Sequence, residues 1–330
     1  MADKKSVVVI GGGTGTSTVL SGLKQLPNIA LTAIVAVSDN GGNSGQLRDE
    51  YGFVPVGDMR QCLAALADGK HSDKVRELLL YRFGGDNLQG YNLGNLILTA
   101  LEDMYKSPGK AVEVAGDILR TTGHVYPISE SATDLIIHYE DGTKIVGEDY
   151  LNYVENGGKK IKKIALTKKV NIYQKAARAI EKADLIIMGP GDLYASLLPN
   201  TLVDGFKESL QKNAGKFVYI VNLMNSFQQT HQMTTANYVE EITKYSGRNP
   251  DVVIINNEAF DQTMLKIYKK HGETPMIDDM VENKQTKILR LPLVAKVKVE
   301  RNKNDLLSRG ILRHDAAKVS KAISDLLNND

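Results

Sequence analysis

Two glycine-rich loops, one strand apart, constrain the fold of this chain more than any other feature. The first loop, residues 11–15 (GGGTG), follows the apolar run at 7–10, and the second, residues 40–45 (NGGNSG), follows the apolar run at 33–37. In a parallel sheet both loops lie at the carboxyl edge, where open α/β folds bind their ligands. Glycine there lets backbone N–H groups approach an anion without a Cβ in the way. The pair therefore predicts a ligand that carries phosphate.

The composition is that of an ordinary globular protein. The 330 residues are 42% hydrophobic and 24% charged, with a net charge of +2, so nothing indicates nucleic acid as a partner. The single cysteine, Cys62, excludes an intrachain disulfide, fits a reducing compartment and has the apolar neighbours of a buried side chain. The apolar stretch near the N-terminus is too short for a signal peptide or a membrane span. We expect a cytoplasmic protein.

Apolar strands alternate with helical patterns along most of the chain. Strands are predicted at 7–10, 33–37, 185–188, 217–221 and 252–255, and helices at 16–26, 59–67, 74–82, 93–105, 112–119 and 315–327. Asn171 and Asp315 are predicted helix N-caps. This alternation predicts an α/β fold with a doubly wound, mostly parallel sheet.

Residues 122–167 are rich in β-strand patterns and do not continue the alternation of strands and helices. The β-rich runs at 134–139 and 143–146 are joined through Asp141-Gly142, a hairpin signal, and residues 161–166 form a third extended run. The lysines between 159 and 169 interleave with apolar residues and indicate a strand with one solvated face. The stretch lacks the apolar mass to fold alone, so we expect an antiparallel insertion within a single domain of residues 1–330.

The first loop matches a dinucleotide fingerprint only in part. It supplies the first two glycines of G-x-G-x-x-G but has Thr16 at the third position. Asp39, at the end of the second strand, is placed to accept a ribose hydroxyl, which leaves an NAD(P)-binding oxidoreductase open as a third interpretation. No lysine follows the glycines, so a Walker A loop is excluded. A tight turn needed only for packing is the structural alternative.

Other polar and glycine-rich turns repeat the theme of the first loop. Arg48, beyond the second loop, is either a phosphate ligand or a surface arginine, and Asp58 is either a plain N-cap or an acid with a role in the site. Gly94 and Asn95 open a helix, and residues 189–194 (GPGDLY) follow the buried strand at 185–188. Glycine-rich turns at three strand ends together predict a polyanionic ligand.

The remaining polar residues give no metal or hydrolase motif. The six histidines have no paired metal-ligand spacing, and a single cysteine is too few for a zinc motif. No metal site is therefore predicted. Ser196 and Ser226 lack a G-x-S-x-G context. Arg313, just before the last helix, is either a phosphate ligand or a surface side chain.

Taken together, these segments resemble the YvcK-type gluconeogenesis factors, a branch of the CofD-like superfamily whose enzymatic members are 2-phospho-L-lactate transferases. The resemblance covers nearly the whole chain. It is carried by residues 11–15, 37–48 (VSDNGGNSGQLR), 57–60 (GDMR), 93–96 (LGNL), 183–191 (ADLIIMGPG), 256–258 (NNE) and 313–315 (RHD).

The resemblance implies a Rossmann-like fold, cytoplasmic location and a role in cell shape and envelope supply during gluconeogenic growth. It implies a nucleotide sugar, with UDP-N-acetylglucosamine favoured, whose diphosphate faces Thr14 and pairs with Arg313, while Tyr268 corresponds to a family tyrosine at the same site. The ligand-binding residues expected are Gly11, Gly12, Gly13, Thr14, Gly15, Asp39, Asn40, Gly41, Gly42, Asn43, Ser44, Arg48, Asn95, Gly189, Gly191, Tyr194, Tyr268 and Arg313.

Three departures from the family pattern separate binding from catalysis. The family usually has two acids where this chain has Asp39-Asn40, a serine where it has Asp192, and a more acidic loop in place of residues 225–230 (NSFQQT). Because Mg²⁺ is held by carboxylates plus substrate phosphates, fewer acids weaken metal-dependent transfer. We therefore expect a binding and regulatory protein. The alternative is a CofD-like transferase, with Mg²⁺ as cofactor, Asp39 as the catalytic acid and Asp58 assisting; a homo-oligomer stays open.

Overall fold

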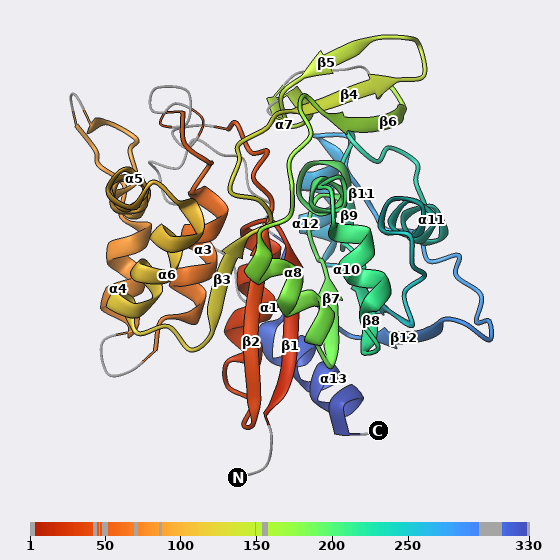
Figure 1. Ribbon diagram of the computed structural model, residues 1–330. Helices are drawn as coiled ribbons and strands as arrows, with labels where there is room; N and C mark the ends of the chain where they lie inside the picture. The colour runs from red at the N-terminus through yellow and green to blue at the C-terminus, as the bar shows by residue number, and fades with distance from the viewer. Residues whose placement is uncertain are drawn as a thin grey trace.

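The core of the protein is a seven-stranded sheet in which every neighbouring pair of strands is parallel (Figure 1). The computed structural model describes residues 4–41, 45, 47, 52–68, 72–85, 88–148, 150–153, 158–296 and 312–328. In sheet order the strands are β12 (Lys287–Leu291), β10 (Val252–Asn256), β8 (Lys216–Ile220), β7 (Leu185–Met188), β1 (Lys5–Gly11), β2 (Ile29–Val35) and β3 (His124–Pro127).

The strand order reverses between β1 and β7. From β1 the chain first adds β2 and β3 on one side, then returns to add β7, β8, β10 and β12 on the other. The central strands are buried apolar runs because helices cover both of their faces: all of Val7–Ile10 and all of β7 are at most 1% exposed. The predicted doubly wound α/β fold is confirmed.

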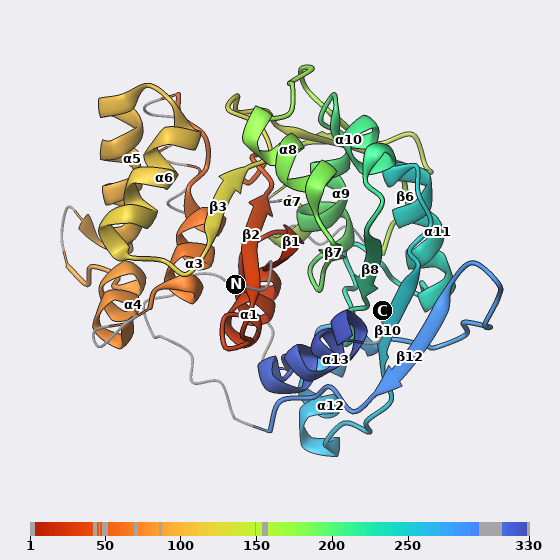
Figure 2. The same ribbon diagram turned by 60° about the horizontal axis from the view of Figure 1, so that its bottom comes forward.

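Helices pack on both faces of the sheet, with α1 and α13 together on one face and α8 and α10 on the other (Figure 2). Among the described residues no helix combines the length and the apolar character that a bilayer crossing requires. The helices are α1 (Thr14–Leu23), α3 (Gly57–Leu66), α4 (Ser72–Leu80), α5 (Leu93–Tyr105), α6 (Pro108–Leu119), α7 (Tyr150–Tyr153), α8 (Gln174–Lys182), α9 (Leu198–Thr201), α10 (Phe206–Lys212), α11 (Thr235–Ser246), α12 (Gln262–Lys269) and α13 (Ala316–Asn328), and a π-helical turn spans Leu193–Leu197.

A separate antiparallel sheet lies at the top of Figure 1. Its order is β5 (Lys144–Val146), β4 (Leu135–Tyr139) and β6 (Ile161–Leu166), which confirms the hairpin and the third extended run. Lys162 and Lys163 of β6 are exposed, as expected for a solvated face. Strand β3 lies within 122–167 but pairs with β2 in the main sheet, whereas the antiparallel sheet spans 135–166. A third, two-stranded sheet joins β9 (Met224–Asn225) to β11 (Thr274–Pro275).

The structure corrects two of the three predicted helix caps. Helix α8 begins at Gln174 with Tyr173 as its N-cap, because Asn171 is still extended and forms a bridge with Asp204. Helix α3 begins at Gly57, so Asp58 lies in the first turn and does not cap it; an acid there is favourable because the N-terminus carries a partial positive charge. Asp315 caps α13 as predicted and accepts from the N–H groups of Ala317 and Lys318 at 2.9 and 3.0 Å.

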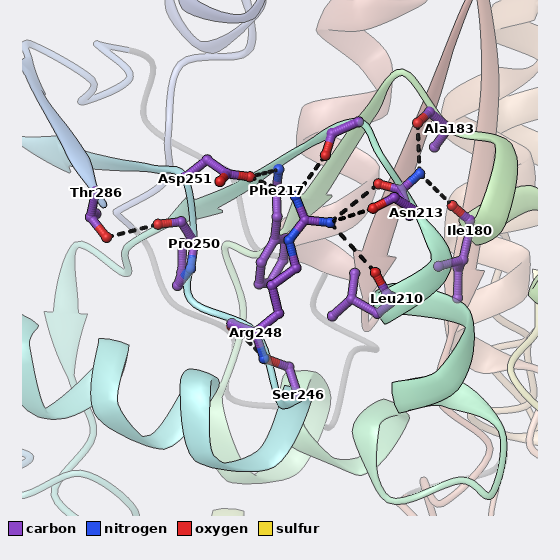
Figure 3. A network of polar contacts seen from close by, with 11 residues as sticks. Ile180, Ala183, Leu210, Asn213, Phe217, Ser246, Arg248, Pro250, Asp251 and Thr286 are labelled. Atoms are coloured by element: carbon purple, nitrogen blue, oxygen red, sulfur yellow. Dashed lines mark hydrogen bonds and ion pairs between the residues drawn. The ribbon is translucent and has the colours of Figure 1, made fainter. Parts of the chain in front are cut away.

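Arg248 joins several elements at the amino edge of the sheet (Figure 3). Its guanidinium donates to the carbonyl of Gly215 at 2.7 Å, to that of Asn213 at 3.1 Å and to the Asp251 carboxylate at 2.8 Å. The same Asp251 oxygen accepts from the N–H of Phe217 in β8 at 2.7 Å. This network aligns the starts of β8 and β10, and the opposite, carboxyl edge is left for the loops of the site.

Candidate functional site

The loops that follow β1 and β7 meet where the strand order reverses. A Cβ on Gly15 would collide with the carbonyl oxygen of Pro190, and a Cβ on Gly12 would lie 2.8 Å from Oγ of Ser196. Only glycine permits this approach. The N–H of Gly191 is oriented by Asn222, which accepts from it at 2.9 Å just after β8. In open α/β sheets ligands bind outside the carboxyl ends of the strands, beside the reversal of strand order, and we refer to this region of the protein as the crevice.

Helix α1 presents its N-terminus at this crevice. Its N-cap is Gly13, with no side-chain cap, and its first turn contains no acid. By contrast, α5 is capped by Asn92 and α11 by Thr234. The first N–H groups of α1 carry a partial positive charge, which is how helix N-termini bind phosphate, and the Asp58 carboxylate lies beside Gly12 and Gly13 at this end of the helix. Thr14 stands in this turn and donates to Oε1 of Gln61 at 3.0 Å.

A buried glutamate, Glu148, lies on the β2 side of the crevice. It is 9% exposed, and its pKa is raised well above the ordinary value, first by desolvation and then by the charges of Asp39, Asp58 and Asp192. Glu148 also hydrogen-bonds Asp39, so the neutral Glu148 carboxyl donates to the Asp39 carboxylate. Asp39 in turn accepts from the N–H of Gly41 at 2.7 Å. Two carboxyl groups here share one proton.

A second polar group lies on the β8 side. Asp192 keeps an exposed surface, yet the surrounding protein desolvates its carboxyl and raises its pKa, while a hydrogen bond from Gln229 acts in the opposite direction. Glu273, after α12, has a pKa of about 7, raised first by desolvation and then by the charge of Asp192. Gln229 itself is 5% exposed. These three groups come from three separate loops.

The carboxyl groups do not form a metal centre. Among residues 4–41, 45, 47, 52–68, 72–85, 88–148, 150–153, 158–296 and 312–328, no three or more His, Cys, Asp or Glu side chains are grouped so as to hold a metal ion. The shared proton between Glu148 and Asp39 also occupies lone pairs that a cation would need. The described residues therefore contain no metal centre built from three or more protein side chains.

Comparison with known proteins places this arrangement in a family. The profile of the family described as 2-phospho-L-lactate transferase CofD matches residues 7–294. The chain belongs to the CofD family. Within it, the gluconeogenesis factor of Bacillus subtilis is 35% identical over 332 residues, covering 99% of both chains, and that of Halalkalibacterium halodurans is 36% identical over 323 residues, covering 97% of this chain and 96% of the relative.

A solved structure has the same architecture. The crystal structure of protein BH3568 from Bacillus halodurans superposes with a TM-score of 0.87 at 35% identity, and the match covers 98% of this chain and 100% of that one. The resemblance to the gluconeogenesis-factor branch is thus confirmed over the full length of the chain.

The crevice brings together many of the residues that the sequence proposes for the site. They are Gly11, Gly12, Gly13, Thr14, Gly15, Asp39, Asn40, Gly41, Asp58, Gly189 and Gly191, which follow β1, β2 and β7 or begin α3. Gly42, Asn43, Ser44 and Arg48 lie outside the described residues. Gly45, at the end of the second loop, is described, and its N–H donates to the carbonyl of Gly41 at 3.1 Å.

Two predicted residues make contacts outside the crevice. Tyr194 is 3% exposed, and its hydroxyl donates to Glu241 of α11 at 3.1 Å, so it ties the β7 loop to that helix. Asn95 is 2% exposed in the first turn of α5, where its N–H bonds the Asn92 cap at 3.2 Å. Both residues hold the elements around the crevice in place.

Tyr268 contacts the segment that leads into α13, and Arg313 belongs to that segment. The hydroxyl of Tyr268 accepts from the N–H of Leu312 at 2.7 Å, and the carbonyl of Arg313 accepts from Ala295 at 2.9 Å. The next residue, His314, bonds the carbonyl of Val221 at 3.1 Å, just beyond the carboxyl end of β8. This contact holds the Arg313 backbone beside the carboxyl edge of the sheet. Burial lowers the pKa of His314 to about 4, so this ring is neutral.

Sequence reasoning missed Glu148 and treated Asp39 as an acid without an acidic neighbour. The structure overturns that premise, because the antiparallel sheet delivers Glu148 to Asp39. It also brings two departures from the family pattern into contact, since Asp192 is hydrogen-bonded by Gln229 of the loop at 225–230. A single acid after a hairpin, such as Glu148, belongs to no periodic pattern that the sequence could reveal. The preceding glycine, Gly147, has a φ of +109° and marks an unusual turn.

Proposed function

We propose that this chain binds a nucleotide sugar of the UDP-N-acetylglucosamine type and acts as a regulatory protein that supports cell shape and envelope supply during gluconeogenic growth. The observation that carries the proposal is the uncapped N-terminus of α1 between two glycine loops that only glycine allows to meet. N–H groups at that place suit a diphosphate. The names of the relatives, gluconeogenesis factors, support the physiological part.

The charges of the crevice must be compatible with an anionic ligand. Several carboxyl groups surround the loops, and as carboxylates they would repel a diphosphate. The protein reduces this repulsion because Glu148 is held neutral and the pKa values of Asp192 and Glu273 are raised. Of the other acids, Asp58 lies beside Gly12 and Gly13, and Asp39 is a hydrogen-bond acceptor suited to a ribose or sugar hydroxyl.

Calorimetric titration tests the proposal directly. The wild-type protein is titrated with UDP-N-acetylglucosamine, UDP and NAD under the same conditions. We expect one-to-one binding of the UDP sugar, weaker binding of UDP and no saturable heat with NAD. Absence of binding at millimolar nucleotide sugar would sink the proposal, and tight binding of NAD would replace it with the oxidoreductase interpretation.

The pair of Glu148 and Asp39 favours one second candidate, a CofD-like transferase. Two neighbouring carboxyl groups in different protonation states are what acid–base chemistry uses, because one can donate a proton while the other accepts one. This candidate predicts turnover of a nucleotide-activated phospholactate with a deazaflavin acceptor and Mg²⁺, abolished in Asp39→Ala. No turnover at saturating substrates would leave the binding function as the better account.

A further inference from the structure

We propose that Asp192, Gln229 and Glu273 form a subsite that binds the hydroxyl groups of the ligand's sugar. The inference rests on the proposed function and deepens it, because it assigns the sugar to the β8 side of the crevice. The three residues come from the β7 loop, the β8 loop and the segment after α12. Asp192 directly follows Gly191, whose N–H donates to Asn222 just after β8.

The side-chain oxygen of Gln229, Oε1, is a buried hydrogen-bond acceptor suited to a ligand hydroxyl. Its side chain hydrogen-bonds Asp192, yet Oε1 of the same amide has no hydrogen-bond partner in the part of the chain that the structure describes. A buried acceptor left unpaired is costly, so proteins rarely retain one without a reason. A hydroxyl donor from a bound sugar would satisfy it.

The loop that carries Gln229 is held rigidly. The hydroxyl of Tyr238, from α11, is hydrogen-bonded to Thr230 at 2.8 Å and to Asn225 at 3.2 Å, and both of those side chains are buried. The Asn225 amide also donates to the carbonyl of Met233 at 2.8 Å. The amide of Gln229 is therefore fixed before any ligand arrives, which lowers the entropic cost of recognition.

The neighbouring acids complete a set of acceptors. Part of Asp192 is exposed to solvent. The protein around its carboxyl group nevertheless displaces water from that group and raises its pKa. Glu273 is close enough for the charge of Asp192 to contribute to its raised pKa. Together with Gln229 these groups present several oxygen acceptors and few donors, which is the complement of a hydroxyl-rich ligand.

An aromatic ring, that of Phe227, lies in the same loop as Gln229 and packs against the residue before Glu273. The Phe227 ring packs against Gly272, where a Cβ would lie 2.8 Å from the ring, and contacts His231 edge to face at 4.8 Å between centroids. Gly272 directly precedes Glu273, and Phe227 is two residues before Gln229. An apolar ring beside polar acceptors matches a sugar, which has apolar C–H faces and a polar rim.

The test compares ligands with and without the sugar. Wild type, Gln229→Met and Glu273→Ala are titrated calorimetrically with UDP, UDP-glucose and UDP-N-acetylglucosamine. Methionine keeps the length of glutamine but removes both polar atoms. Gln211→Met, on an exposed position of α10, is the matched control. We expect wild type to bind both UDP sugars at least tenfold more tightly than UDP. Gln229→Met should lose about tenfold and Glu273→Ala about fivefold for the UDP sugars, with UDP changed by less than twofold and the control unchanged.

The outcomes separate this subsite from the proposed function. If wild type binds neither UDP nor a UDP sugar, the proposed function fails and the subsite with it. If wild type binds UDP and the UDP sugars equally, the subsite is wrong while a diphosphate site remains. Equal losses for UDP and UDP sugars in the variants, or no loss at all, also overturn the subsite. Binding of UDP by each variant reports that the fold is intact, and Glu273→Ala gives an independent answer if Gln229→Met does not fold.

Discussion

The carboxyl group of Glu148 hydrogen-bonds the carboxylate of Asp39, although the two residues follow strands of different sheets. Asp39 follows the central strand β2, and Glu148 follows β5 of the antiparallel sheet. Close beside them, a Cβ on Gly147 would lie 2.5 Å from Nδ2 of Asn40. The antiparallel sheet thus supplies a proton-bearing group to the ligand-binding edge of the parallel one, and the charge of that edge depends on pH.

Affinity for UDP-N-acetylglucosamine should fall as pH rises from 6 to 8. Glu273, with a pKa of about 7, is mostly neutral at pH 6 and mostly ionised at pH 8, whereas a diphosphate diester keeps its charge throughout. Negative charge added beside an anionic ligand weakens binding. Titrations at both pH values should show a several-fold loss in wild type and a smaller one in Glu273→Gln. Glu240→Gln, at an exposed position of α11, should behave as wild type, and an equal pH dependence in all three proteins would contradict the assignment.

Gly15→Ala should weaken both folding and binding. The new Cβ would meet the backbone carbonyl of Pro190, which cannot swing aside as a flexible side chain can, so the β1 and β7 loops must separate. We expect the free energy of unfolding to fall by about 1–3 kcal/mol in denaturant titrations. Gly85→Ala is the matched control, because a Cβ there has no described atom within 4 Å. Equal stability of the two variants would show that the loops do not pack as described.

Glu102→Gln should stabilise the protein at pH 8 more than at pH 5. Glu102 is 4% exposed, its Oε1 accepts from the N–H of Val54 at 3.1 Å, and desolvation raises its pKa to about 7 from 4.5. Between those pKa values the folded state binds more protons than the unfolded one, so the contribution to stability is complete below pH 4.5 and is lost as pH rises through 7.

Denaturant titrations of this variant measure the effect. Glutamine does not ionise and keeps the oxygen that Val54 needs, so the gain at pH 8 should be about 1–3 kcal/mol and should shrink towards pH 5. Glu77→Gln, at an exposed position of α4, should change stability by less than about 0.5 kcal/mol at either pH. A gain that is the same at both pH values would argue against an ionised buried carboxylate.

Arg248→Ala should destabilise the fold without touching the crevice. The change leaves the carbonyl groups of Asn213 and Gly215 and the Asp251 carboxylate without this donor at the amino edge of the sheet (Figure 3). We expect the free energy of unfolding to fall by roughly 2–4 kcal/mol, with affinity for UDP-N-acetylglucosamine unchanged below the unfolding midpoint. Arg178→Ala, on the exposed side of α8, is the control. A loss of affinity in Arg248→Ala would show that the two edges are coupled.

How well each strand could be predicted from the sequence depends on how completely it is buried. The central strands could be predicted because strands covered on both faces are continuous apolar runs, as in β7. The two edge strands were not predicted, because only part of each is buried: β3 alternates His124, Val125, Tyr126 and Pro127, and β12 is Lys-Ile-Leu-Arg-Leu. Partial burial removes the uniform pattern that identifies a strand.

The site could be predicted only where glycine marks it. Glycine is required at Gly15 by the Pro190 backbone and at Gly12 by the Ser196 side chain, and such positions can be recognised in the sequence. Glu148, Gln229 and Glu273 contribute through contacts between distant segments, and a single acid or amide in a loop has no periodicity to reveal its partner. The family resemblance located the crevice, and the structure added the groups that surround it.

A crystal structure of the protein grown with UDP-N-acetylglucosamine tests the central claim most directly. We expect the diphosphate within hydrogen-bonding distance of the N–H groups at the start of α1, between the loops after β1 and β7, with the sugar towards Gln229. A ligand whose diphosphate lies away from these loops, in crystals where the nucleotide is fully occupied, would contradict it.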